Sequence, residues 1–264
     1  MIGRISAVLV LVALAAGGAG LWYYRSGSFP LKPPADELAA DDEWLDNLHS
    51  QNPRVAEDAA GHVASLGAAA LPEVLEALRD PAAEPGRKKA AIKACGILGP
   101  LATPAVNDVA AHLPIPDYTT EAAVALSFMG RDAFAPLRAA LGSDDPIVRR
   151  ESLRSLGKLR ERAPLDARAV IPLLLEGIAD PDPGVRVVAA TYLGIIHESG
   201  ETAVPALLET LTDEDAEVRS AAAGALGSFG AAAEPAIPAL RKAAGDRDEN
   251  VAREAGLALV KLQK

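Results

Sequence analysis

Apolar positions along the chain follow a pattern that repeats every 30 to 37 residues. In each unit an acidic turn precedes a residue that opens an alanine-rich segment, with apolar residues spaced to fall on one face of a helix. Three stretches show this most clearly: PDPGVRVVAATYLGII from Pro181, DEDAEVRSAAAGALGSF from Asp213 and DRDENVAREAGLALVKL from Asp246. The opening position can be followed through seven units as Val55, Arg87, Tyr118, Val148, Val185, Val218 and Val251. A fixed period of this length indicates a repeat architecture.

Further positions repeat with the same spacing. Apolar residues lie eight positions after the opening one, at Val63, Cys95, Leu126, Leu156, Leu193, Leu226 and Leu259. Small residues lie four positions after it, at Ala59, Ala91, Ala122, Ser152, Ala189, Ala222 and Ala255. Gly67, Gly99, Gly130 and Gly230 follow four of the segments at one offset, as helix C-terminal caps do. We therefore expect one buried face per helix, with small residues where neighbouring helices approach closely.

A second periodic segment lies between these helices. Examples are LPEVLEAL from Leu71, AVPALLETL from Ala203 and AIPALRKA from Ala236. A proline stands near the start of each, at Pro72, Pro104, Pro136, Pro172, Pro205 and Pro238. Proline is tolerated in the first helical turn, where its missing N–H has no partner anyway. Each unit is thus predicted to be a helix, a short acidic turn and a second helix, giving an all-α repeat domain over residues 43–264.

These motifs resemble the HEAT repeat family, in particular the short HEAT-like repeats of the phycobilisome-lyase type. The match rests on an aspartate shortly before Val-Arg, clearest over residues 144–149, 180–186 and 213–219. The resemblance implies an α-α superhelix, here an α-solenoid of about seven helical hairpins, whose second helices line a concave binding surface. It also implies that Arg149, Arg186 and Arg219 bridge neighbouring repeats, with the partners expected at Asp145, Asp182 and Asp215.

The N-terminal 42 residues differ from the repeats. Residues 5–24 are free of charge and lie between Arg4 and Arg25. Twenty helical residues span about 30 Å, the thickness of the hydrocarbon core of a bilayer, and Trp22 begins an aromatic cluster at the end of the segment. We expect residues 1–25 to form a transmembrane anchor, with a cleaved secretory signal as the alternative. Residues 26–42, rich in proline and glycine, are expected to form a linker.

Flanking charges do not settle the orientation of this segment, because Arg4 and the amino terminus nearly balance Arg25 and Lys32. We favour a single pass through a bacterial-type inner membrane with the repeat domain exported.

Composition narrows the possible functions. Half of the residues are apolar and only 4% are aromatic, which disfavours disorder and β-sandwiches. The net charge is −10, and the first 34 residues carry +3, so the remainder carries −13. A body this acidic argues against nucleic-acid binding. One cysteine excludes a disulfide framework within the chain.

The sequence offers little chemistry. The resembled family includes an iron-dependent hydroxylase built from several His-Glu pairs, whereas this chain has one, His197-Glu198, and a metal site needs at least three ligands. No phosphate-binding loop or nucleophile elbow occurs, and Cys95 falls in a core column. We expect no catalysis, no cofactor, no metal and no small-molecule substrate. A lyase or hydroxylase relative, or a structural spacer, remains the alternative.

The remaining candidate is the helix face opposite the core, where we expect a partner-binding surface. Basic and apolar residues alternate there between repeats: Lys89, Lys93, Ile97, Val124, Phe128, Arg150, Arg154, Lys158 and Ile195. Such a mixture is typical of interfaces with an acidic, partly apolar peptide or protein. The alternative is that these cations only solvate the surface, paired with neighbours such as Glu121 and Glu151, and that Phe128 packs under a helix.

Overall fold

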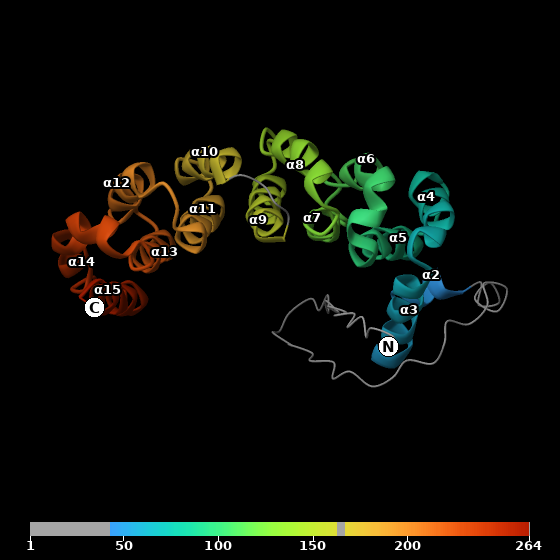
Figure 1. Ribbon diagram of the computed structural model, residues 1–264, viewed down its shortest axis with the longest axis horizontal. Helices are drawn as coiled ribbons and strands as arrows, with labels where there is room; N and C mark the ends of the chain where they lie inside the picture. The colour runs from blue at the N-terminus through green and yellow to red at the C-terminus, as the bar shows by residue number, and fades with distance from the viewer. Residues whose placement is uncertain (1–42, 163–166, 264) are drawn as a thin grey trace, which may run out of the picture. The chain divides into compact units, whose positions relative to one another are not determined.

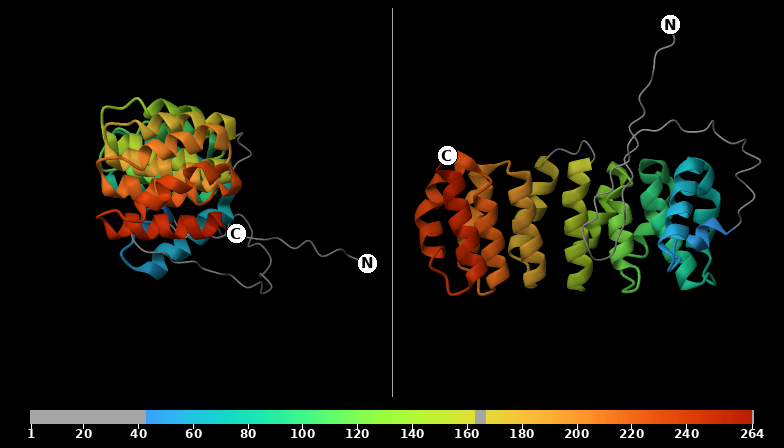
Figure 2. Two further views of the ribbon diagram at one scale, coloured as in Figure 1. Left: turned by 90° about the vertical axis from the view of Figure 1, so that its left-hand side faces the viewer. Right: turned by 90° about the horizontal axis from the view of Figure 1, so that it is seen from below.

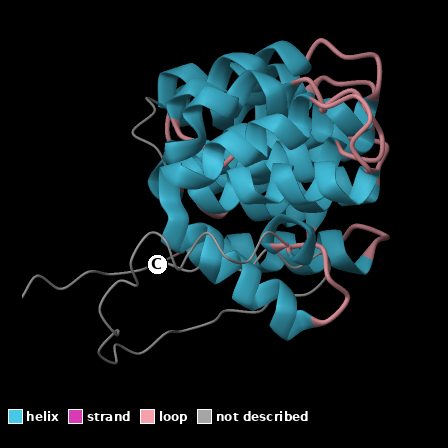
Figure 3. Cartoon of the chain, turned by 90° about the vertical axis from the view of Figure 1, so that its right-hand side faces the viewer, coloured by secondary structure: helices cyan, strands magenta, loops and turns pink. Residues whose placement is uncertain are grey.

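The computed structural model describes residues 43–162 and 167–263. Every regular element in these ranges is helical (Figure 3). The described residues from Trp44 onward belong to one compact unit. The expected all-α repeat fold is therefore confirmed for this unit, while the anchor or signal over residues 1–25 and the linker over residues 26–42 lie outside the described residues.

The helices of the unit form two rows (Figure 1). The inner row consists of α3 (Pro53–Leu66), α5 (Pro85–Leu98), α7 (Thr119–Leu126), α9 (Pro146–Arg162), α11 (Pro183–Ile196), α13 (Ala216–Leu226) and α15 (Glu249–Leu262). The outer row consists of α4 (Leu71–Arg79), α6 (Val106–Ala110), α8 (Phe134–Ala140), α10 (Ala167–Ile178), α12 (Gly200–Thr210) and α14 (Ile237–Ala243). Successive helices within each row run side by side (Figure 2).

Short elements complete the unit. The 3₁₀ helices η1 (Gly67–Ala70), η2 (Gly99–Ala105), η3 (Arg131–Ala133) and η4 (Gly230–Ala236) lead from inner to outer helices. Helix α2 (Trp44–Asn47) stands before α3 and buries Trp44 and Leu45. The inner helices thus coincide with the seven units of the sequence pattern.

The core lies between the rows and along the inner row. The small-residue column that includes Ala189 and Ala222 is buried in every repeat. Gly194 shows how close the helices come: a Cβ there would lie 2.6 Å from the Cα of Ala225 on the next inner helix. Gly227 faces Ala258 in the same way, at 2.8 Å. Small side chains therefore set the spacing of the inner row, as expected from the pattern.

Two of the four predicted glycine caps directly end a helix: Gly67 is the C-cap of α3 and Gly99 that of α5. Helices α7 and α13 instead have their C-caps at Ser127 and Gly227, shortly before Gly130 and Gly230. Gly67, Gly99, Gly130 and Gly230 all have positive φ, between 54° and 86°. At the same offset α11 ends in His197, whose φ of 40° places it in the left-handed region. Glycine is the usual residue in this conformation because it has no Cβ to clash with the preceding turn.

The prolines are placed less uniformly than expected. Pro72 lies in the first turn of α4 and Pro238 in that of α14. Pro205, however, lies inside α12, because that helix already begins at Gly200, and Pro172 lies inside α10.

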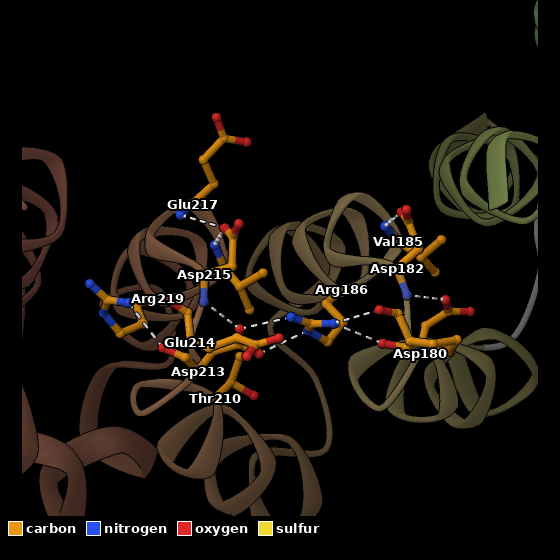
Figure 4. Close-up of polar contacts among 12 residues, drawn as sticks. Asp180, Asp182, Val185, Arg186, Thr210, Asp213, Glu214, Asp215, Glu217 and Arg219 are labelled. Carbon is orange, nitrogen blue, oxygen red and sulfur yellow. Dashed lines mark hydrogen bonds and ion pairs between the residues drawn. The ribbon is translucent and has the colours of Figure 1, made fainter.

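Arginine–aspartate pairs join consecutive repeats, as the resemblance implied, but through other aspartates. Arg149 binds Asp180, Arg186 binds Asp213 and Arg219 binds Asp246, each through two hydrogen bonds of 2.8 to 3.0 Å. Each arginine also donates Nη1 to two backbone carbonyls of the turn that precedes its own helix. Figure 4 shows Arg186 between that turn and Asp213.

The prediction that Asp145, Asp182 and Asp215 make these bridges was wrong. Asp182 and Asp215 cap the N-termini of α11 and α13, accepting hydrogen bonds from backbone N–H groups of the first turn. Asp145 does the same for the N–H of Ile147. In the turns at 180–182, 213–215 and 246–248 the earlier aspartate is the bridge and the later one the cap, because only the later side chain lies over the free N–H groups of the helix end.

Candidate partner-binding face

The predicted surface residues all lie on the inner row, on the side opposite the core. Helix α5 carries Lys89, Lys93 and Ile97, α7 carries Val124 with Phe128 just after its end, α9 carries Arg150, Arg154 and Lys158, and α11 carries Ile195. None of these side chains is fully buried. We call this surface the inner face.

The two inner-face lysines of α5 are already engaged within the fold. Lys89 Nζ lies 3.8 Å from a carboxylate oxygen of Glu121. Lys93 donates a 2.9 Å hydrogen bond to the backbone carbonyl of Leu48, and burial lowers the pKa of Lys93. The alternative interpretation, that cations of this face serve the fold, thus fits α5.

Helix α9 is different, because it presents a continuous line of positive charge. Arg150, Arg154 and Lys158 are joined by Arg162, which follows at the same interval of four residues. Side chains at this interval lie on one side of a helix, about 6 Å apart. Arg162 was not among the residues predicted from the sequence, although continuing the same spacing for one more turn identifies it. We call these four residues the α9 stripe.

One buried carboxylate partly neutralises the α9 stripe. Glu151, only 3% exposed, accepts hydrogen bonds from Arg150 Nε and Arg154 Nη1, both at 3.1 Å. No described carboxylate lies within ion-pair distance of Lys158 or Arg162. Burial lowers the pKa of Lys158, and the charges of Arg162 and Arg154 lower it further. The stripe therefore keeps an excess of positive charge on an acidic protein.

Phe128 is less free than the sequence suggested. It is half-buried, and the guanidinium of Arg162 stacks over its ring at 4.0 Å from the centroid. Arg162 also donates to Ser127 Oγ at 3.2 Å. The stacking is a cation–π contact, so Phe128 helps to hold the end of the α9 stripe.

Beyond α11 the inner face is hollowed. An open hollow of about 350 Å³ lies over α11, α13 and α15. Its floor includes Ser220, Gly224 and Ser228, and Ile195, 47% exposed, stands at its edge. Its lining comprises Thr191, Gly194, Ile195, Ser220, Ala221, Gly224, Ala225, Ser228 and Glu254. The sequence showed these small residues singly, but their joint effect as a hollow depends on the missing side-chain volume of adjacent helices.

The histidine, glutamate and cysteine side chains considered for catalysis or metal binding do not lie together in one site. His112 is buried and bonds its Nδ1 to the carbonyl of Asp108, while His197 caps α11. Glu198 pairs with Arg160 instead of a metal-site neighbour. Within the described ranges no three His, Cys, Asp or Glu side chains are grouped so as to hold a metal ion. Cys95 is buried as expected, and burial raises the pKa of its thiol to about 12.

In the described part of the chain no helix is long and apolar enough to cross a membrane. The candidate anchor over residues 5–24 lies outside the described residues.

Comparison with known proteins supports the family resemblance. The family model for HEAT repeats matches residues 171–261. No curated protein sequence matches the chain. A structure of Kap121p matches with a TM-score of 0.60 and 16% identity, covering 83% of this chain and 30% of that one. A structure of Kap95p with RanGDP matches with a TM-score of 0.57 and 16% identity, covering 88% of this chain and 36% of that one.

A structure of Kap121p bound to Nup53p matches with a TM-score of 0.58 and 15% identity, covering 80% of this chain and 28% of that one. The chain therefore spans about a third of the length of these proteins, and the likeness shows the fold, a HEAT-type solenoid. Human deoxyhypusine hydroxylase is also similar, at 20% identity over 83% of both chains, but its TM-score of 0.40 carries no argument.

Proposed function

We propose that this protein is a non-catalytic scaffold that binds another protein through its inner face. One observation carries the proposal: the α9 stripe places four cations in a line on a protein of net charge −10, with a single buried carboxylate beside them. Like charges four residues apart disfavour a helix by roughly 0.2–0.5 kcal/mol per pair. Such a line is expected where an acidic partner compensates the repulsion.

The comparisons support a binding role at the level of the fold. Kap121p, which shares this type of solenoid, has been crystallised with Nup53p bound. A shared fold hosts many functions, so the identity of the partner must come from the face of this chain.

A pull-down from native membranes tests the proposal. The charges of Arg150 and Arg154 are best left in place, because replacing them with glutamate would bury Glu151 beside new carboxylates. Lys158→Glu with Arg162→Glu reverses the other half of the α9 stripe. The matched control, Arg241→Glu with Lys242→Glu, makes the same charge change on α14, where both side chains are exposed on the outer row.

We expect a protein that wild type and control capture and the stripe variant loses, with all three giving the same circular dichroism spectrum. Equal capture by all three variants would contradict a role for the inner face.

We further propose that residues 5–24 anchor the protein in a bacterial-type inner membrane, with the repeat domain exported. The proposal rests on the uncharged twenty-residue segment and the aromatic residues at its end. Membrane fractionation of the full chain and of a chain lacking residues 1–25 tests it. The full chain should stay in the membrane after a carbonate wash and the truncated chain should not. A mature N-terminus near residue 20 would instead establish the cleaved signal.

A further inference from the structure

From α9 to α13 the inner face changes its chemistry from helix to helix but hardly along each helix. Helix α9 presents cations over its full length. Helix α11 presents Val187, Thr191 and Ile195, also at intervals of four. Helix α13 presents Ser220 and Gly224, and Ser228 follows just after its end. These three helices are neighbours in the inner row (Figure 1). A cationic stripe, an aliphatic stripe and a shallow floor of small residues therefore lie side by side.

This arrangement suits a ligand that runs along the helices. A chain crossing the row would meet each chemistry at one point only. A ligand parallel to α9 and α11 can place acids along the whole cationic stripe and apolar groups along the whole aliphatic one.

We propose that the inner face from α9 to α13 binds an acidic amphipathic helix of a partner protein. This inference rests on the proposed binding function and specifies its ligand. Carboxylates at intervals of four residues on a helix lie about 6 Å apart, as the stripe cations do. The stripe from Arg150 to Arg162 is about 18 Å long, which corresponds to a partner helix of about twelve residues.

An extended acidic peptide fits the face less well. In an extended chain successive side chains point to opposite sides, so residues between the acids would point away from the face. A helix instead presents its acidic and apolar sides over adjacent sectors of one surface, where α9 and α11 can both be contacted.

The hollow supplies the room that a helix needs. Its floor bears only small side chains, because position 224 is glycine and positions 220 and 228 are serine. Ile195 at its edge offers apolar surface. Large apolar residues of the partner helix would fill the hollow while its acids lie against Arg154, Lys158 and Arg162. The lining of the hollow is uncharged except for Glu254, whose carboxylate repels acidic side chains. The side of the partner helix that faces the hollow should therefore carry no acids.

Anisotropy titrations of the full-length protein with labelled synthetic peptides test the inference. The first peptide is an 18-residue (about five turns) helix former with glutamates every fourth residue on one side and leucines on the adjacent side. The second has the same composition in scrambled order, so that its charge is equal but its sides are mixed. A single-stranded DNA oligonucleotide serves as a third, non-peptide polyanion.

Three variants separate the contributions. Lys158→Glu reverses one charge of the stripe. Gly224→Leu fills the hollow, and its Cβ is tolerated because the nearest atom, at 3.4 Å, is a terminal oxygen of the Glu254 side chain. Arg241→Glu on the outer row is the control. Circular dichroism and thermal melts establish that each variant is folded.

We expect the amphipathic peptide to bind at least about tenfold more tightly than the scrambled one, since only it can meet both stripes at once. Lys158→Glu should weaken this binding by about tenfold or more and Gly224→Leu by a similar factor, while Arg241→Glu leaves it unchanged.

Equal binding of both peptides, or binding that Gly224→Leu leaves unchanged, would overturn the helix inference. The proposed function would still be supported in that case if Lys158→Glu weakened the binding. Binding indifferent to both variants would overturn both. DNA binding as tight as peptide binding would reassign the stripe to polyanions and also overturn the inference.

Discussion

His197 occupies a helix end where the equivalent residue of four other repeats is glycine. Its φ of 40° is positive like theirs, but its ψ of 33° places it in the left-handed helical region, whereas Gly67 and Gly99 have ψ values of −132° and −129°. The His197 ring bonds through Nδ1 to the carbonyl of Ile195 at 2.9 Å, which compensates part of the unfavourable backbone conformation. The sequence pointed to this residue as half of a His-Glu pair, whereas its repeat position indicates a cap.

Replacing His197 with glycine should stabilise the protein. The left-handed conformation costs residues with a Cβ roughly 1–2 kcal/mol, part of which the ring hydrogen bond offsets. We expect His197→Gly to raise the free energy of unfolding by about 1 kcal/mol in urea titrations. Gly230→Ala, at the equivalent repeat position after α13, should have the opposite effect, because Gly230 also has a positive φ that disfavours a residue with a Cβ. A destabilised His197→Gly variant would show that the ring contacts outweigh the backbone strain.

Among the elements, the arginine–aspartate pairs give the clearest electrostatic contribution to stability. Burial raises the pKa of Asp213, but hydrogen bonds from Arg186 and from the N–H of Asp215 outweigh it, so that the pKa is lowered. The same balance lowers the pKa of Asp180 through Arg149. Each carboxylate therefore stabilises the fold above its unfolded pKa of about 3.9, and the contribution is lost as the pH falls through the folded-state value.

Substitutions of two neighbouring aspartates test which of them pairs with the arginine and which caps the helix. Asp213→Asn removes the charge that pairs with Arg186, itself only 11% exposed, and should cost about 2 kcal/mol at pH about 7. Asp215→Asn should cost under about 0.5 kcal/mol, because asparagine caps helices as well as aspartate does. Urea unfolding between neutral and acidic pH measures both. The deficit of Asp213→Asn should shrink below about pH 4, where the wild type also loses the charge; equal effects of both substitutions would reverse the roles given to them.

The α9 stripe makes the opposite prediction, a gain of stability when charge is removed. Lys158 lies one turn from Arg154 on one side and from Arg162 on the other, and burial and both charges lower its pKa. We expect Lys158→Gln to raise the free energy of unfolding by about 0.5 kcal/mol at low salt, and by less at about 1 M salt, where the Debye length is about 3 Å. Lys242→Gln, on the exposed end of α14, is the control. A loss of stability in Lys158→Gln would mean that the lysine serves the fold.

The repeat pattern allowed much of this fold to be predicted, because residues such as Ala189 and Ala222 recur wherever helices approach closely. The bridging aspartates were misassigned because each acidic turn offers two carboxylates two residues apart, and only their position relative to the helix end distinguishes them. The hollow was not predicted, since it arises from small residues on three helices together. Most of the inner face was predicted, yet Arg162 was missed where the helix extends one turn beyond its equivalents.

At the scale of the whole repeat unit, stability depends on contacts between neighbours. The contact of Gly194 with Ala225 joins α11 to α13, and that of Gly227 with Ala258 joins α13 to α15. In such a stack each repeat contacts only the adjacent ones, so a weakened seam lowers the stability of the repeats beyond it most. Local unfolding should then be confined to one end of the unit.

Gly194→Ala is the sharpest test of this view. Its new Cβ would lie 2.6 Å from a backbone atom of α13, which cannot move aside as a side-chain tip can, so the seam should open at a cost of about 1–3 kcal/mol. We expect amide hydrogen exchange to accelerate in α13 and α15 and to remain close to wild type in α5 and α7. Gly256→Ala on α15, where a Cβ meets nothing within 4 Å, is the matched control and should accelerate exchange in none of the four helices, since alanine favours a helix interior over glycine. Uniform acceleration throughout the unit would instead show that the repeats unfold as a single cooperative block, and the inner face would then be lost or kept as a whole.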